Sequence, residues 1–301
     1  MNPMNQGIVN YHYIREQGDR GIHPCTTERF REQVRSLLRT HEPVSVEELY
    51  AIAARREPGK FFALTFDDGL AEHYRVAFPL LREHRIPGTF FVLGMPLAER
   101  RMPPSHALHV LLSRRSTEEL IAMLERHARG AVRVDRREPM NPKRRFDDVL
   151  TANLKETLIR MPLAERLGFI RYALASVVPD EAAFVKAFFM DADEVREMDQ
   201  AGMTIGAHTM SHAALDTLGA AEQEQEIRRG NAALAAVLGR KSAMFSYPHG
   251  RFTEETAHIL AAEGFRYGVT LEVRDLSAAD DPLRIPRYDT NDMEGGAERT
   301  P

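Results

Sequence analysis

Two adjacent carboxylates follow an apolar run at residues 61–70, which read FFALTFDDGL. An apolar run bounded by a turn is typical of a strand covered on both faces, and such a strand excludes charge. Asp67 and Asp68 are therefore predicted at the point where the strand ends. Successive side chains of an extended segment point to opposite sides, so the two carboxylates should have different neighbours and different roles. A purely structural alternative is a turn in which Gly69 takes a positive φ.

Two histidines four residues apart form the second candidate group. His208 and His212 follow the apolar stretch 203–207, and on one helical turn both imidazoles would reach one ion. Alone, such a pair is as often a surface or capping pair as a ligand pair. Together with Asp68, the histidines make a three-ligand set that leaves coordination positions open for water and substrate. This combination favours a catalytic metal site.

Three motifs, taken in order, resemble those of the polysaccharide deacetylase family, the NodB-homology or carbohydrate esterase family 4 proteins. The first two are TFDDG at 65–69 and HTMSH at 208–212, and the third is FSYPHG at 245–250, in a form without the family's arginine. The pair Tyr11-His12 at the end of a first strand is similar to that of many members. The resemblance covers about residues 7–95 and 193–288, and three motifs in the family's order make it specific.

The resemblance implies an α/β fold, a deformed (β/α) barrel of the NodB type formed by residues 1–95 and 193–301. The residue pattern agrees, because predicted strands alternate with predicted helices. The strands are predicted at 7–13, 61–66, 88–94, 203–207, 243–247 and 266–271. Residues 96–192 carry apolar residues at helical spacing and are interpreted as a helical insertion, a possible substrate-specificity cap or dimer contact. One domain with an insertion suits 301 residues.

The resemblance also implies a role for the residues of the site. A divalent metal, by analogy zinc, would be held by Asp68, His208 and His212 and would polarise the amide carbonyl and activate a bound water. Asp67 would act as the general base on that water. Collapse of the tetrahedral intermediate then requires an acid that protonates the departing amine.

The sequence departs from the family pattern in two places. Ser246 stands where the third motif normally has its arginine, so the residue that holds Asp67 must come from elsewhere, and Arg284 and Arg287 are the candidates. The late Leu-x-His motif that brings the general acid is absent, since no histidine follows His258. Its possible replacements are His12, His106, His109 and His249. We assign Arg287 and His249 to the catalytic group with Asp67, and substrate binding to Tyr247, Pro248, His12, His106 and His109.

The predicted function is a metal-dependent hydrolase that removes an N-acetyl group from an amino sugar, or from a nucleotide-linked or lipid-linked sugar. A deformylase or another C–N amide hydrolase on the same fold is one alternative. A carbohydrate-binding relic without activity is another, but a pure binder has no need of Asp67 as base. An iron oxygenase also uses two histidines and one carboxylate, and the lack of any His-x-Asp or His-x-Glu pair disfavours it.

Charge, cysteine content and hydropathy limit the partners and the cellular location to be expected. The formal net charge of −4 gives no reason to expect a nucleic-acid partner. Residues 96–160 nevertheless contain 14 Lys and Arg against 9 Asp and Glu, an excess that could steer an anionic substrate, although a solvated helical face also explains it.

The single cysteine, Cys25, excludes an intramolecular disulfide. No apolar run has the length of a signal peptide or membrane span, so we expect a cytoplasmic protein, possibly a homo-oligomer.

Overall fold

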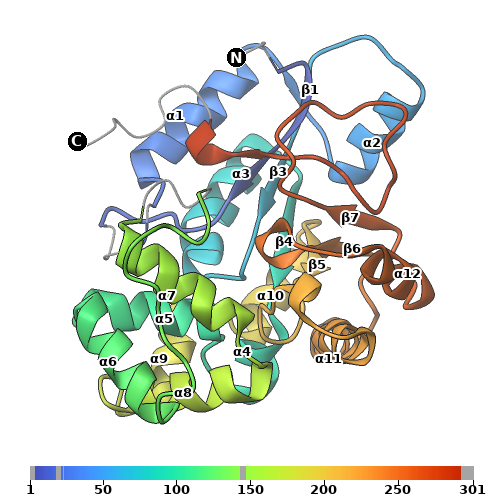
Figure 1. Cartoon of the computed structure of the whole chain (residues 1–301). Helices are drawn as coiled ribbons and strands as arrows, with labels where there is room; N and C mark the ends of the chain where they lie inside the picture. The colour runs from blue at the N-terminus through green and yellow to red at the C-terminus, as the bar shows by residue number, and fades with distance from the viewer. Residues whose placement is uncertain (1–3, 18–21, 23, 143–146, 293–301) are drawn as a thin grey trace.

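A curled parallel β-sheet forms the centre of the computed structural model, which describes residues 4–17, 22, 24–142 and 147–292 (Figure 1). The strands are β1 Gln6–Tyr11, β2 Glu42–Pro43, β3 Phe61–Phe66, β4 Gly88–Val92, β5 Thr204–Ala207, β6 Met244–Ser246, β7 Tyr267–Val269 and β8 Tyr288–Asp289. Their order is β7-β6-β5-β4-β3-β1-β8, and β2 pairs with β3. Every pairing between these described strands is parallel. The predicted α/β class is therefore confirmed.

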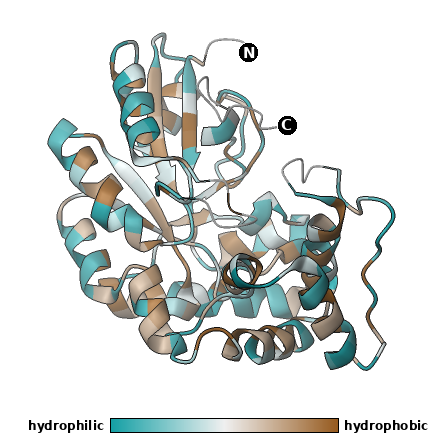
Figure 2. Ribbon diagram, turned by 90° about the vertical axis from the view of Figure 1, so that its left-hand side faces the viewer, coloured by the Kyte–Doolittle hydropathy of each residue, from teal (hydrophilic) through white to brown (hydrophobic). Residues whose placement is uncertain are grey.

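The central strands are apolar because both of their faces are covered. In β3, Phe62, Leu64 and Phe66 pack into one buried cluster, while Ala63 packs into a second cluster on the opposite face. This alternation is the period of two expected for a strand. Figure 2 shows hydrophobic residues along the strands and hydrophilic residues alternating with them around the helices. Asp67 and Asp68 follow directly after Phe66, the last residue of β3, as the sequence predicts, and both are buried.

Residues 285–289, the closing segment, complete the curved wall of the sheet. At one end Ile285 forms a parallel bridge with Val269 beside β7, and its N–H donates to the carbonyl of Gly268 over 2.8 Å. At the other end Tyr288 and Asp289 form β8 and pair with β1. The segment therefore bridges β7 and β1, which lie at the two ends of the series β7-β6-β5-β4-β3-β1. Arg287 lies in the middle of it and is fully buried.

Helices cover the outside of the sheet, and their ends follow local sequence signals. They are α1 Thr27–Leu38, α2 Val46–Ala54, α3 Phe78–His84, α4 Gly94–Glu99, α10 Ala192–Gln200, α11 Ala220–Leu238 and α12 Glu254–Ala262. The Ser45 side chain accepts a hydrogen bond from the N–H of Glu48 and caps α2. Gly239, at a φ of 73°, ends α11 in the left-handed conformation. A π-helical turn, His73–Ala77, precedes α3.

Five further helices lie together beside the sheet (Figure 1). They are α5 Pro104–Arg114, α6 Thr117–His127, α7 Val149–Arg160, α8 Leu163–Ala175 and α9 Glu181–Phe188. Their buried side chains form a cluster of their own, which also includes Tyr13, Leu70 and Leu93 from the sheet side. The helical character of this part is as predicted, and it packs against the loops that follow the strands. Across the described residues, no helix has both the length and the hydropathy needed to cross a bilayer.

Candidate active site

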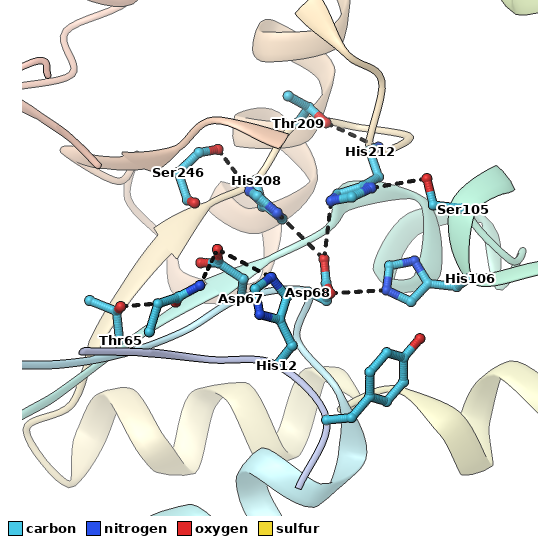
Figure 3. A network of polar contacts seen from close by, with 12 residues as sticks. His12, Thr65, Asp67, Asp68, Ser105, His106, His208, Thr209, His212 and Ser246 are labelled. Carbon is cyan, nitrogen blue, oxygen red and sulfur yellow. Dashed lines mark hydrogen bonds and ion pairs between the residues drawn. The ribbon is translucent and has the colours of Figure 1, made fainter. Parts of the chain in front are cut away.

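The side chains that can bind a metal or exchange a proton gather at the carboxyl ends of neighbouring strands (Figure 3). His12 comes directly after β1, Asp67 and Asp68 after β3, and His208 after β5. Because all of these strands are parallel, their carboxyl ends meet at one edge of the sheet, which is where α/β folds usually place a site. Residues separated by up to about 200 positions in the chain are thereby brought together.

Asp68 lies at the centre of three histidines. Its Oδ1 is 3.4 Å from Nε2 of His208 and 3.3 Å from Nε2 of His212. Its Oδ2 is 3.1 Å from Nε2 of His106, which projects from α5. Burial raises the pKa of Asp68, but His106 and His212 outweigh it and hold this pKa well below its usual range. The carboxylate is therefore ionised within an almost fully buried cluster.

The set formed by Asp68, His208 and His212 fits a divalent metal ion. One potential ligand atom from each residue lies within 4.8 Å of the others. Four ligands placed about 2.0–2.1 Å from a tetrahedral ion are separated by about 3.3–3.4 Å, close to the two distances above. Asp68 Oδ1 and His208 Nε2 are buried without a hydrogen-bond partner among the described residues. A buried polar atom without a partner costs folding free energy, unless a hydrogen bond or a metal ion satisfies it.

The remaining ring nitrogens of the two histidines have partners that fix their orientation. The Nδ1–H of His208 donates to the carbonyl of Ser246 over 2.7 Å. Nδ1 of His212 lies 3.1 Å from Oγ of Ser105. In each ring Nε2 is the atom turned toward Asp68 (Figure 3). This is the arrangement by which outer partners orient metal-binding histidines.

The prediction that His208 and His212 share one helical turn is wrong. Residues 208–212 form an irregular loop in which Thr209 and His212 have φ values of 66° and 61°. The hydroxyl of Thr209 accepts a hydrogen bond from the N–H of His212 over 3.1 Å and closes the turn. Asp68 and His249 are also at positive φ. Non-glycine residues adopt this conformation at a cost, and such residues cluster at functional sites.

Asp67 is held from the other side by an arginine. Nη1 and Nη2 of Arg287 donate to Oδ1 and Oδ2 of Asp67 over 3.0 and 2.9 Å, and the amide of Asn10 donates to Oδ2 over 3.1 Å. Burial raises the pKa of Asp67, but Arg287, followed by His208 and His12, outweighs it and lowers this pKa to about 2. The two carboxylates thus have the separate neighbours that their alternation predicts.

The fully buried guanidinium of Arg287 also bonds to the strands around it. Its Nε donates to the carbonyl of Thr270 over 2.8 Å, and Nη1 donates to Oγ1 of Thr65 over 3.2 Å. Nη2 donates to Oγ of Ser246 over 3.1 Å. Ser246, which stands where the third motif would carry its arginine, therefore accepts a hydrogen bond from an arginine that arrives on the segment 285–289.

Arg284, the other candidate for this role, does not reach Asp67. Its guanidinium pairs with Glu254 at the surface and lies 3.8 Å from Asp281. The two arginines are three residues apart. Only Arg287, which belongs to the closing segment, has a fully buried side chain. The sequence alone left this choice open.

The remaining candidate histidines surround the same space. Nε2 of His12 is 3.8 Å from Oδ2 of Asp67, and its side chain is one-third exposed. The ring centroid of His249 is 4.5 Å from that of His212. Nδ1 of His109 lies 3.0 Å from the hydroxyl of Tyr13. The sequence grouped His106 with His109, but the structure places only His106 against the carboxylate of Asp68.

A cavity of about 290 Å³ opens on these residues. Asp68, His212 and His249 line one part of it, together with the three other histidines of positions 12, 106 and 109. Residues of α5, α7 and α8 also line the cavity. They contribute the apolar side chains of Leu108, Leu158, Ile159 and Ile170 and the cationic side chains of Lys155 and Arg166. The predicted insertion thus supplies much of the cavity.

Two predicted substrate-binding residues do not line this cavity. The Tyr247 side chain is 1% exposed, its hydroxyl donates to the carbonyl of Leu283 over 2.7 Å, and its ring stacks on Phe252 at 4.4 Å. Pro248 is buried in the short turn Pro248–Gly250. Both side chains face the core because they anchor the loop that carries His249. Neither side chain is therefore placed to contact a substrate in this cavity, and the assignment of substrate binding to Tyr247 and Pro248 stays a prediction.

Asn10, Thr65 and Arg166 are among the residues of the site that were not identified from the sequence. Asn10 and Thr65 are polar residues inside otherwise apolar strands, and that interruption is the signal that could have identified them. Arg166 had no such signal, because an arginine in a helix usually faces solvent. Its place in the cavity depends on how α8 packs against α5.

Comparisons with known proteins agree with the geometry. The family model described as polysaccharide deacetylase matches residues 54–128 and 146–268. The match includes most of the predicted insertion. The Bacillus subtilis (strain 168) protein YxkH, whose name assigns it to the polysaccharide deacetylases, is 26% identical over 127 residues. These residues are 42% of this chain and 43% of YxkH, so the chain spans less than half of that relative.

Solved structures resemble the whole chain. A Streptococcus pyogenes deacetylase, PplD, in complex with acetate, has a TM-score of 0.61 at 19% identity, with 99% of this chain and all of that chain covered. IcaB from Ammonifex degensii has a TM-score of 0.58 at 20% identity, with 95% and 92% covered. At such identities the likeness concerns the fold, and the predicted deformed barrel of the NodB type is confirmed.

Proposed function

The chain belongs to the polysaccharide deacetylase family, and from this premise we propose that it is a metal-dependent hydrolase that removes an N-acetyl group from an amino sugar or a sugar conjugate. One observation carries the proposal. A carboxylate clamped by an arginine, Asp67, stands next to a second carboxylate, Asp68, that faces two histidine Nε2 atoms. The first is built to exchange a proton and the second to bind a cation.

Asp68, His208 and His212 would hold the metal. Zinc is the proposed identity, since a set of two imidazoles and one carboxylate with open positions is typical of catalytic zinc sites. When bound, the metal would polarise the amide carbonyl and lower the pKa of a water molecule. His106 hydrogen-bonds to the other oxygen of Asp68 and would keep that carboxylate in its binding orientation.

Asp67 is the proposed general base. With a pKa of about 2 its carboxylate is ionised at neutral pH. Arg287 and Asn10 fix both of its oxygens, so that the carboxylate does not rotate as it accepts a proton from water.

His249 is the proposed acid. The C–N bond of the tetrahedral intermediate breaks only when the departing amine receives a proton. His249 lines the cavity beside His212. His12 lines the cavity next to Asp67 and is the second candidate. The amine would leave with the proton, and acetate would be the other product.

The helices α5–α9 are proposed to act as a cap that sets substrate specificity. Three of them contribute residues to the cavity that Asp68 and His212 also line, which favours a cap over a dimer contact. The acetate in the PplD structure is consistent with a reaction of this class, because acetate is the product expected here.

The first test is the metal content of the purified protein by elemental analysis, with acetate release from a panel of N-acetylated sugars. We expect about one metal per chain, and acetate release that a chelator abolishes and added zinc restores. The Asp67→Asn variant, prepared in the same way, controls for contaminating hydrolases. Acetate release that survives complete metal removal, or that Asp67→Asn retains, would overturn the proposal.

A further inference from the structure

Arg166 is a buried cation in the cavity wall. It lies in the second turn of α8, and its side chain is 4% exposed. Its Nη1 donates to the carbonyl of Ile159 over 3.3 Å, while Nε is buried without a hydrogen-bond partner among the described residues. No carboxylate oxygen of a described residue lies within 4.0 Å of its guanidinium, the distance that defines the ion pairs of this structure.

The other cationic side chain of that wall is neutralised. Nζ of Lys155 lies 2.6 Å from Oδ1 of Asp147. Glu226 interacts electrostatically with Arg166 and raises its pKa, but the two form no direct ion pair. Oε2 of Glu226 accepts a hydrogen bond from the N–H of Ser211 over 2.8 Å. Arg166 therefore differs from Lys155 in two ways. It has no direct ion pair with a described residue, and its Nε–H donor has no partner among the described residues.

A buried guanidinium that has no direct ion pair and an unpartnered donor costs folding free energy. Burial lowers the pKa of Arg166, because removal from water disfavours the charged form of the side chain. A group that destabilises a fold in this way is commonly retained for function. The five donors of a guanidinium match the oxygens of a carboxylate or a phosphate, and an apolar environment strengthens the contact. The neighbouring Ile159 and Ile170 provide that environment.

We propose that Arg166 is an anion anchor of the cavity, and that the substrate is an N-acylated sugar carrying a phosphate or a carboxylate. The inference rests on the proposed function, since Asp68 and His212 line the same cavity and would receive the amide. The volume of about 290 Å³ is at the lower end of ligand cavities. One sugar unit with its charged group suits this space better than several units of a neutral polymer.

Binding selectivity tests the proposal. Affinities of the metal-loaded protein would be measured by calorimetry for N-acetylglucosamine, for its 1-phosphate, and for an N-acetylated hexosamine that bears a carboxylate. At least one charged ligand should bind about tenfold or more tightly than the neutral sugar, as for a charge-assisted contact. Arg166→Gln should remove this preference. The exposed Arg171 on the same helix offers a matched control, because Arg171→Gln should keep it.

The outcomes separate the ligand sources. A preference for the phosphate alone or the carboxylate alone would identify the anion, provided that Arg166→Gln abolishes it. A preference that persists in Arg166→Gln would assign anion binding to the metal and overturn the proposal. Equal affinity of the wild-type protein for all three sugars would overturn it as well.

Thermal stability gives a readout that is independent of catalysis. Arg166→Met should raise Tm in the absence of ligand, because it removes a buried charge that has no direct ion pair. Inorganic phosphate should raise Tm of the wild-type protein and of Arg171→Gln, but not of Arg166→Met. A lower Tm for Arg166→Met, with an unchanged response to phosphate, would assign Arg166 a structural role and overturn the proposal.

Failure of this inference is distinguishable from failure of the proposed function. If neutral and charged sugars release acetate with equal kcat/KM, the anion anchor is wrong and the deacetylase proposal stands. If no sugar releases acetate but the Arg166-dependent preference for anions remains, the anchor stands and the reaction must be revised.

Discussion

The guanidinium of Arg287 and the carboxylate of Asp67 form a two-point contact between residues 220 positions apart in the chain. Both groups are buried, and the contact connects the closing segment of the sheet to the end of β3. The geometry fixes both oxygens of the proposed base.

Replacement of Arg287 by lysine should therefore impair turnover while sparing the metal. Lysine keeps the charge but cannot form the two parallel hydrogen bonds. Misplacement of a reacting group by about 1 Å can cost about 100-fold in rate, so we expect kcat of Arg287→Lys to fall by about that factor. Acetate release and elemental analysis would be measured side by side. Arg284→Lys, at the surface, is the control, and wild-type kcat in Arg287→Lys would contradict the assignment.

Asp67 and Asp68 should respond differently to substitution. Asp68→Ala and His208→Ala should lose the metal, because each removes a ligand atom of a three-residue set. Asp67→Asn should retain the metal and lose turnover, since an amide cannot accept the proton from water. Metal content and kcat of the three variants are the measurements. Full activity of Asp67→Asn would rule out its role as base.

The pair should also produce an acid-dependent loss of stability. The pKa of Asp67 is about 2 in the folded protein and 3.8 in its reference state. A lowered folded-state pKa stabilises above the unfolded value, so the contribution is complete above about pH 4 and disappears as the pH falls toward 2. It amounts to about 2 kcal/mol. The free energy of unfolding of wild type minus that of Asp67→Asn, measured by urea titration, should shrink over that range. A pH-independent difference would refute this explanation.

His106 should influence metal affinity without being a ligand. Loss of a hydrogen bond to a metal-binding carboxylate typically lowers affinity about 10- to 100-fold. We therefore expect His106→Gln to lower the affinity for zinc by that factor in a competition titration with a chromophoric chelator. His109→Gln, on the same helix but in contact with Tyr13, should bind zinc as the wild type does. Equal affinities for all three proteins would remove His106 from the metal site.

The proposed acid can be identified with substrates that differ in leaving group. His249→Gln should lower kcat for an acetamido sugar by about 100-fold or more, within the range for general acid catalysis. It should leave the hydrolysis of 4-nitrophenyl acetate nearly unchanged, because nitrophenolate departs without a proton. His12→Gln is measured in parallel. If His12→Gln rather than His249→Gln discriminates the two substrates, the acid is His12.

Much of the site could be predicted because its residues follow apolar strands. The runs before Asp67 and His208 fix both positions at one edge of a parallel sheet, whatever the remaining chain does. Local backbone geometry could not be predicted in the same way. The pair His208 and His212 converges through a loop with positive φ values, and spacing alone cannot distinguish such a loop from a helical turn.

Contacts made by packing were the other part that the sequence did not specify. Arg284 and Arg287 differ only in which side of an irregular segment they occupy, and that side depends on the pairing of Ile285 with Val269. His106 reaches Asp68 because α5 lies over the strand ends. These relations depend on tertiary packing, for which local residue patterns carry little information.

The closing segment makes the proposed base depend on a strand that is distant from it in the sequence. Residues 285–289 bridge β7 and β1, and Arg287 lies among them. Without these residues Asp67 would lose its two-point contact with the guanidinium. A chain cut by a protease before residue 285 should therefore release acetate from acetylated sugars far more slowly than the intact chain.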